Sequence, residues 1–523
     1  MAESMKQGMN RDGSVPRPEI GAGREPVRVS THAWIGRLLG PLLAIVVYTV
    51  LPDGVTHAGR GVAAVGTLMA VWWMSEALPL AATALLPVAL FPLLGVGDIE
   101  DATTPYANDI VFLFMGGFML ALAMQRWGLH RRIALRTVLA VGTRPVRMVG
   151  GFMLATAFLS MWVSNTATTV VMLPIGMSVL TLVFEHLHGS SAAEDTERVT
   201  ATTNTDSGRF AVCLMLAIAY AASIGSLATL IGTPPNLFMA GFLSENHGVH
   251  IGFAQWMVFG LPLAAVLLVL AWLLLTRVIY PTNITEIPGG RELFRNELAK
   301  LGPMNRGERF VLVVFVLTAA LWILRQPLSD RLPWLNLSDA GIAIAAALVL
   351  FVIPLHPRQG VFALDWGSAG ELPWGVLLLF GGGLSLASAV GSSGLDTFIG
   401  TRVGALDSVP LPLLVLIAVA AIIFLTEMTS NTATAATFLP ILAGVALGLD
   451  TDTLLLVVPA TVAASCAFML PVATPPNAIV FGSGYVTIPQ MVKAGWWLNL
   501  AALVLIPLAL YGLGGWALGI TLG

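Results

Sequence analysis

Ser164-Asn165-Thr166-Ala167-Thr168 and Ser430-Asn431-Thr432-Ala433-Thr434 are the same five-residue stretch, which occurs twice in the sequence. Both copies lie near the middle of long apolar segments, at a constant offset of 266 positions (430 − 164). Unpaired polar groups are costly in an apolar environment, by kcal/mol each when the environment is hydrocarbon. The duplication therefore indicates that these polar residues have a purpose that both halves of the chain share.

The composition is that of a polytopic membrane protein. Of the 523 residues, 56% are hydrophobic and 11% are charged, and the mean hydropathy is +0.84. Soluble domains carry roughly 25% charged residues. The formal net charge of −3 gives no basic character, so no nucleic-acid partner is expected.

Hydropathy divides the chain into full spans, hairpins and polar segments. Two polar-centred segments, 148–184 and 410–446, each split into pieces too short to span, and they are predicted to be re-entrant hairpins. Residues 1–33 are predicted to be a disordered cytoplasmic tail, before a first transmembrane helix at 34–57. Eleven full spans are expected, at about 20 residues each: 34–52, 58–75, 78–96, 109–127, 209–242, 253–281, 307–325, 338–355, 371–392, 453–484 and 494–520.

The repeat extends well beyond the polar motifs. Gly232-Thr233-Pro234-Pro235-Asn236 and Ala473-Thr474-Pro475-Pro476-Asn477 correspond at an offset of 241 positions (473 − 232). Paired prolines remove backbone donors, so a helix must break at each. The chain is therefore divided into a first repeat at 58–281, a cytoplasmic linker at 282–306 and a second repeat at 307–523. The 266 offset also relates Phe114, Gly116, Gly117, Leu120, Ala121, Gly128 and Leu129 to Phe380, Gly382, Gly383, Leu386, Ala387, Gly394 and Leu395.

The distribution of basic residues sets the orientation. With a cytoplasmic amino terminus, the basic clusters at 126–147 and 291–309 both lie inside, as positive-inside statistics favour. Five spans separate the hairpins, so the hairpins enter from opposite faces and the repeat is inverted. An integral, multi-pass protein of the plasma membrane is expected. The segment 126–147 also has the spacing of an amphipathic helix at the cytoplasmic interface.

The repeated motifs are suited to binding an anion and cations. The half-helices after Asn165 and Asn431 direct their positive N-terminal ends at the hairpin tips, where an oxyanion would be stabilised. The preceding half-helices end in free carbonyls, and Ser160 or Thr426 lies one turn upstream. These groups offer neutral oxygen ligands that suit sodium. Duplicated polar breaks at membrane depth are typical of a transporter's binding site.

These motifs resemble the divalent anion/sodium symporter family over nearly the whole chain from about residue 34. The segments Leu113-Phe114-Met115-Gly116-Gly117-Phe118 and Gln125-Arg126-Trp127-Gly128-Leu129 are also similar to that family. The resemblance implies a sodium-coupled carrier of dicarboxylates, citrate or sulfate. It further implies a homodimer in lipid, in which a transport domain moves against a scaffold as an elevator.

The resemblance also implies roles for individual residues, carried over by motif. A substrate dianion is expected to contact Asn165, Thr166, Ser430, Asn431, Thr432, Thr474 and Pro475. The first sodium site is expected at Ser160, Ser164, Asn165 and Gly232. The second sodium site is expected at Thr426, Thr429, Asn431 and Ala473.

Several alternatives remain open at this stage. A succinate-like dicarboxylate is favoured, because two hairpin tips suit two carboxylates, but citrate or sulfate symport and anion exchange are alternatives. An intramembrane enzyme is disfavoured, since no His-Glu-x-x-His or Gly-x-Ser-x-Gly motif occurs. A channel is disfavoured because opposed hairpins offer alternating access and not a continuous water path. Glu427 is predicted to brace its hairpin through backbone amides, although it could carry a proton or strengthen the second cation site. Glu76 is predicted to be an interfacial charge.

Overall fold

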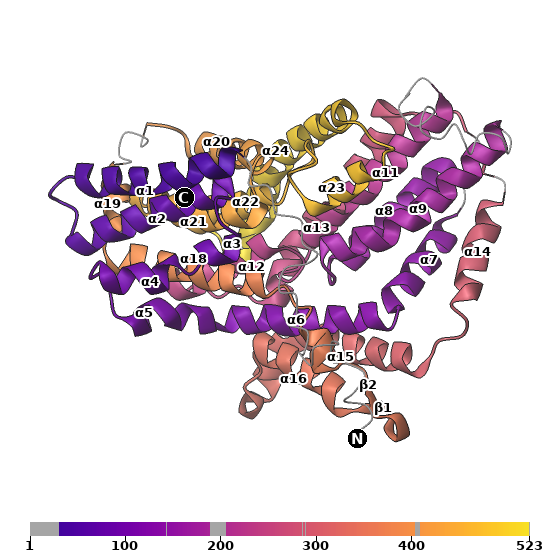
Figure 1. Ribbon diagram of the computed structural model, residues 1–523, viewed down its shortest axis with the longest axis horizontal. Coiled ribbons are helices and arrows are strands. Elements are labelled where there is room, and N and C mark those ends of the chain that lie inside the picture. Colours follow the sequence, from indigo (N-terminus) through magenta and orange to yellow (C-terminus); the bar gives the residue numbers. More distant parts are fainter. Residues whose placement is uncertain are drawn as a thin grey trace, which may run out of the picture.

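The computed structural model describes residues 31–142, 144–188, 205–284, 286–287, 289–402 and 408–521. Helices dominate these ranges (Figure 1), which confirms the predicted all-α membrane architecture. Most of the predicted tail, residues 1–30, lies outside the described residues, and α1 begins at Thr31. A short antiparallel pair, β1 (Pro354–His356) and β2 (Val361–Phe362), was not predicted; it pairs Pro354 with Phe362 and His356 with Val361.

Helices of the first half follow the expected segments, and the breaks between them occur mostly at glycine, proline or a polar motif. In chain order they are α1 (Thr31–Val50), α2 (His57–Ser75), α3 (Leu80–Thr83), α4 (Leu86–Leu93), α5 (Ile99–Thr103), α6 (Asp109–Arg126), α7 (Leu129–Val141), α8 (Pro145–Ser160), α9 (Asn165–His188), α11 (Asp206–Ser226), α12 (Pro234–His247) and α13 (Phe253–Leu273).

The linker between the two repeats contains a helix that the sequence did not predict. The segment 282–306, expected to be a polar loop, contains α14 (Gly290–Lys300), whose exposed charged residues are compatible with a surface helix. The remaining helices are α15 (Arg306–Arg331), α16 (Asp339–Val352), α17 (Trp366–Ala369), α18 (Trp374–Ser392), α19 (Leu395–Arg402), α20 (Leu411–Thr426), α21 (Asn431–Gly448), α22 (Leu454–Ala464), α23 (Pro475–Gly482) and α24 (Ile488–Leu518).

Within the described ranges, nine helices are long and apolar enough to cross a bilayer. Two of these, α9 and α21, are the second arms of the two polar-centred hairpins. Four of the eleven predicted spans do not count among the nine: α2, the broken pairs α3–α4 and α22–α23, and the short α16. Breaks and short helices of this kind are tolerated at membrane depth when protein surrounds them.

The repeat in the sequence is also a repeat in the helix boundaries. Helices α8 and α20 begin at 145 and 411 and end at 160 and 426, and α9 and α21 begin at 165 and 431. Four residues therefore separate the two arms of each hairpin, which is enough to reverse the chain and too few for another element. The arms α8 and α9 run side by side in Figure 1.

Helix α11 forms the centre of this half of the molecule. Its apolar window is 94% buried, against 39% for the window that includes α13. A helix that is apolar on all sides must be surrounded by protein or lipid, and α11 packs against α8, α9, α13 and α23. Small residues permit the closest approach: a Cβ atom at Gly225 would lie 2.3 Å from the Ala157 carbonyl oxygen.

The predicted basic helix exists as α7, but one of its arginines is buried. Arg132 Nε lies 2.9 Å from Glu308 Oε1, and both side chains are 4% exposed. Arg132 also donates to the Gly302 and Leu301 carbonyls near the end of α14. The helix is therefore held to α14 and α15 by a desolvated ion pair, which the expectation of an interfacial helix did not include.

We expect Arg132→Met to lower the free energy of unfolding by about 3–5 kcal/mol, because it leaves the Glu308 charge buried without its partner. Thermal unfolding of the purified protein in detergent measures this effect. The neighbouring Arg131, whose side chain is 45% exposed, provides the control. Arg131→Met should change stability by less than about 1 kcal/mol. Equal effects of the two variants would contradict the structural role assigned to the buried pair.

Candidate functional site

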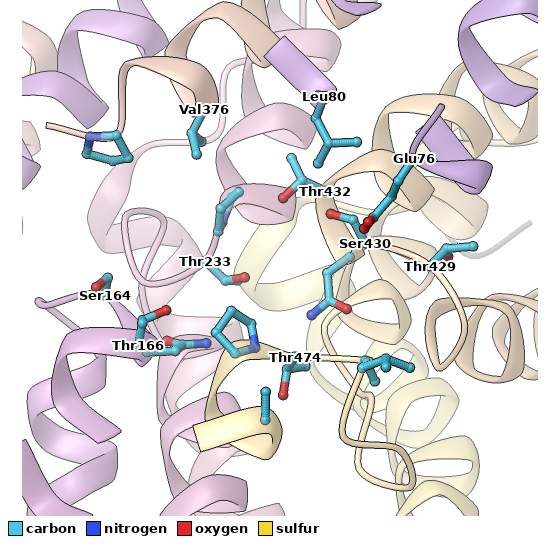
Figure 2. A pocket seen from close by; sticks show the side chains of 18 of the residues that line it. Glu76, Leu80, Ser164, Thr166, Thr233, Val376, Thr429, Ser430, Thr432 and Thr474 are labelled. Carbon is cyan, nitrogen blue, oxygen red and sulfur yellow. The ribbon is translucent and has the colours of Figure 1, made fainter. Parts of the chain in front are cut away.

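A cavity of about 1640 Å³ lies where the two hairpins meet the two broken spans (Figure 2). Its polar part is formed by the hairpin tips at Ser164–Ala167 and Thr429–Thr432 and by the starts of α12 and α23. The rest is largely apolar and comes from α1, α2, α6 and the start of α18. Every residue predicted to contact the substrate lines this cavity: Asn165, Thr166, Ser430, Asn431, Thr432, Thr474 and Pro475.

Four helix N-termini border the polar part of the cavity, where the sequence predicted two. Helices α9 and α21 begin at the tips, and α12 and α23 begin behind the N-cap residues Thr233 and Thr474. The first backbone amides of a helix lack intrahelical acceptors and carry partial positive charge. Among the described residues that line the cavity there is no Lys or Arg. At the hairpin tips an anion would therefore meet neutral donors and helix ends, whereas the carboxylates of Glu76 and Glu371 also line the cavity.

Three oxygen atoms converge beneath the first hairpin tip. Ser160 Oγ lies 2.6 Å from Asn165 Oδ1 and 2.6 Å from the carbonyl oxygen of Ala222 on α11. Ser160 is fully buried. Asn165 Nδ2 is directed elsewhere, to Ser226 Oγ at 3.3 Å. The hydroxyl brings one proton to this cluster, and both of its neighbours are acceptors.

The second half repeats the arrangement. Thr426 Oγ1 lies 2.8 Å from Asn431 Oδ1 and 2.9 Å from the carbonyl oxygen of Ala464, at the end of α22. The single hydroxyl proton cannot fully satisfy both acceptor oxygens. Each cluster therefore keeps oxygen lone pairs that are not used by a strong hydrogen bond. Neutral oxygens in close convergence are the ligands that a hard cation prefers. The donor set therefore fits a monovalent cation in each half.

The other residues predicted for the cation sites lie beside these clusters. Ser164, Thr429, Gly232 and Ala473 all line the cavity, whereas Ser160 and Thr426 are buried behind it. A Cβ atom at Gly232 would lie 2.3 Å from the Ser226 carbonyl oxygen, so only glycine allows this approach. The Thr429 hydroxyl bonds to the Leu425 carbonyl and to Thr434.

Comparison with known proteins agrees with this geometry. The family described as the sodium:sulfate symporter transmembrane region matches residues 32–519. The chain belongs to this family. Its members are transporters, so the chain is a multi-pass membrane transport protein and not an enzyme.

Two named relatives of this symporter family come from staphylococci, and both are described as the sodium-dependent dicarboxylate transporter SdcS. The protein of Staphylococcus saprophyticus is 43% identical over 489 residues, covering 93% of this chain and 92% of the relative. The protein of Staphylococcus aureus strain MRSA252 is 42% identical over 498 residues, covering 94% and 93%.

A solved structure shares the fold of this symporter. The YdaH transporter of Alcanivorax borkumensis, described as having an unusual topology, superposes with a TM-score of 0.55. The match covers 87% of this chain and 99% of that chain at 16% sequence identity. At this identity the likeness concerns the fold alone.

Several functional groups were not predicted. The Ala222 and Ala464 oxygens belong to backbone and carry no mark in the sequence. Glu76, predicted to be an interfacial charge, also lines the cavity, with a left-handed backbone (φ 48°) at the end of α2. Figure 2 shows its carboxylate among the labelled side chains of the second tip.

Asn236 and Asn477 hold the two breaks open. Asn236 Nδ2 donates to the Leu227 and Thr229 carbonyls, and Asn477 Nδ2 donates to the Ala467 and Leu470 carbonyls. Both asparagines are fully buried. The sequence signal for both residues is the asparagine that follows each Pro-Pro pair.

Glu427 occupies the second hairpin tip and is 3% exposed. Its carboxylate accepts hydrogen bonds from the amides of residues 468–470 and from Asn499 Nδ2, at 2.7–3.1 Å. The carboxylate does pair with backbone amides, as predicted, and the amides come from the break between α22 and α23. Glu427 thus ties the hairpin tip to the broken span and to α24.

We expect Asn477→Asp to destabilise the protein by about 2–4 kcal/mol, because a carboxylate cannot donate to the two carbonyls and leaves them unpaired. Asn236→Asp should have an effect of the same size at the other break. The thermal midpoint of the purified protein is the measurement. Asn336→Asp, an isosteric change at an exposed turn, serves as the control and should leave the midpoint nearly unchanged. A tolerated Asn477→Asp would refute this account of the breaks.

Proposed function

We propose that the protein is a secondary active transporter that imports succinate-type dicarboxylates together with sodium. The observation that carries the proposal is the pair of three-oxygen clusters that flank a cavity whose polar part is bordered by four helix N-termini. The oxygen clusters suit sodium, and the helix ends suit carboxylates. The relatives named sodium-dependent dicarboxylate transporters support both assignments.

Coupling follows from the charges that line the cavity. Moving a dianion out of water is strongly unfavourable unless opposite charge compensates it. No Lys or Arg among the described lining residues offers that charge. Bound sodium ions would supply it, since Asn165 and Asn431 belong to the oxygen clusters and also face the cavity. Sodium and dianion should therefore bind with strong mutual dependence.

A dicarboxylate is the proposed substrate because the two tips present separate helix ends. Each tip offers its own amides and hydroxyls, which suits a carboxylate at each end of a short carbon chain. Citrate and sulfate are the alternatives, since backbone donors discriminate weakly among oxyanions. Exchange of two anions is the remaining alternative for the mode of transport.

We further propose that the hairpins, broken spans and helices α13 and α24 move as one body against the rest of the chain. Support comes from hydrogen bonds that join them: Ser160 and Thr426 to the broken spans, Tyr220 Oη to the Met491 carbonyl, and Tyr280 Oη to the Gln490 carbonyl. The resemblance to the symporter family suggests that the remaining helices form a scaffold within a homodimer in the plasma membrane.

In the proposed orientation, with a cytoplasmic amino terminus, the cavity opens inward. It is lined by the first half of α1, the last turns of α2, the second half of α6 and the residues just before α18. Each of these ends is cytoplasmic in an inverted repeat of this polarity. The structure would therefore correspond to the state that releases substrate into the cell.

In proteoliposomes we expect saturable uptake of labelled succinate that requires an inward sodium gradient. Asn165→Ala and Asn431→Ala should each reduce uptake at least about 100-fold, since each removes an oxygen shared by cation and anion sites. Ser178→Ala, an exposed hydroxyl on α9, should transport normally. Sulfate uptake without competition by succinate would overturn the substrate assignment. Undiminished uptake by either asparagine variant would overturn the site in that half.

Movement of the site is tested by accessibility. In a variant whose buried Cys213 and Cys466 are replaced by alanine, we expect Thr166→Cys to react with a membrane-impermeant thiol reagent from one face at a time. Sodium and succinate should shift the reactive fraction between the faces, because ligands change the population of the two states. Simultaneous labelling from both faces, insensitive to ligand, would indicate a pore.

A further inference from the structure

The two hairpin tips, residues 161–164 and 427–430, differ in one charged side chain. Position 161 in the first tip corresponds to position 427 in the second at the 266 offset, and the residues are Met161 and Glu427. In the first half, the tip is tied to its broken span by a neutral hydrogen bond from Thr229 Oγ1 to the Met161 carbonyl (2.5 Å). In the second half, the corresponding tie is made by the Glu427 carboxylate.

The hydrogen bonds of Glu427 require the ionised form. All its partners, the amides of residues 468–470 and Asn499 Nδ2, are donors, and each carboxylate oxygen accepts two or more bonds. A protonated carboxyl group would need an acceptor for its own hydrogen. None of these partners can accept it through the bonding atom.

This negative charge is buried without a protein counter-ion. Among the ion pairs within the described part of the chain, none involves Glu427. Buried charges are ordinarily paired or bind a metal ion. The nearest proposed cation ligand, Thr426, is the adjacent residue, and the amides that hold the carboxylate precede Ala473 in the same break.

We propose that Glu427 is a positioning residue whose charge makes the second cation site the stronger of the two, so that sodium fills it first. This inference rests on the proposed sodium coupling. The carboxylate does not need to touch the ion, because a unit charge acts across several ångströms in a poorly solvated region. The first half, with Met161 and a neutral tie, lacks this contribution.

The test uses purified full-length protein and sodium-dependent thermal stabilisation, with choline chloride replacing sodium chloride to hold ionic strength constant. A cation that binds the folded state stabilises it by RT ln(1 + [L]/Kd), so fitting the sodium dependence of the thermal midpoint gives the half-saturating sodium concentration. For Glu427→Gln we expect the half-saturating sodium concentration to rise about 10-fold or more. Uptake at saturating sodium should retain a near-normal half-saturating succinate concentration.

Two further variants distinguish the effect of the Glu427 charge from the effect of its hydrogen bonds. Asn499→Ala removes one hydrogen bond to the carboxylate and keeps the charge, so it should lower the midpoint without sodium and leave the sodium half-saturation within about 3-fold. Glu427→Asp also keeps the charge and should behave likewise, which preserves the test if the Gln variant does not fold. A Glu427→Asp protein with 10-fold weaker sodium binding would overturn the proposal. So would a Glu427→Gln protein with unchanged sodium half-saturation.

A double-mutant cycle assigns the effect to one half. Glu427→Gln and Thr426→Ala should be non-additive in their effect on sodium half-saturation, because both act on the second site. Glu427→Gln and Ser160→Ala should add, because Ser160 belongs to the first cluster. The reverse pattern would overturn the assignment. If sodium does not stabilise the unmodified protein at all, the proposed function fails, which is a distinct result.

Discussion

One buried hydroxyl group between two acceptors organises each half of this symporter. Ser160 and Thr426 each lie at the end of a hairpin arm, and each brings together the first side chain of the next arm and a carbonyl of a broken span. Three segments are thereby joined at one point, although 62 residues separate Ser160 from Ala222. The helix breaks, the four-residue tips and the close approach of α8 to α11 all serve to bring these oxygens together.

The duplicated motif made much of the architecture predictable. A constant offset links the starts and ends of α8 and α20 because the same local signals, a proline at the first turn and a polar residue at the tip, act in both halves. All residues assigned to the substrate line the cavity because they flank the helix breaks. The sequence marks these breaks with Asn, Thr or paired Pro. The tie made by Glu427 was predictable for a related reason, since an isolated carboxylate at that depth requires donors.

Other features could not be read from residue types. The Ala222 and Ala464 oxygens are backbone atoms, and the sequence contains no sign of which carbonyl faces a tip. The place of Glu76 in the cavity lining follows from the packing of α2 beside the cavity and not from local hydropathy. The burial of Arg132 depends on Glu308, 176 positions away, and α14 was missed because a short charged helix has the composition of a polar loop.

The absence of Lys and Arg from the described cavity lining has a consequence for release kinetics. A fixed guanidinium would retain the anion whatever the sodium concentration, and an anion held in this way could cross back alone. With cations as its only formal positive partners, the anion's residence time is set by how long sodium stays. The low sodium concentration of a cytoplasm would then set the rate at which the anion is released, and the carrier would not need a separate release mechanism.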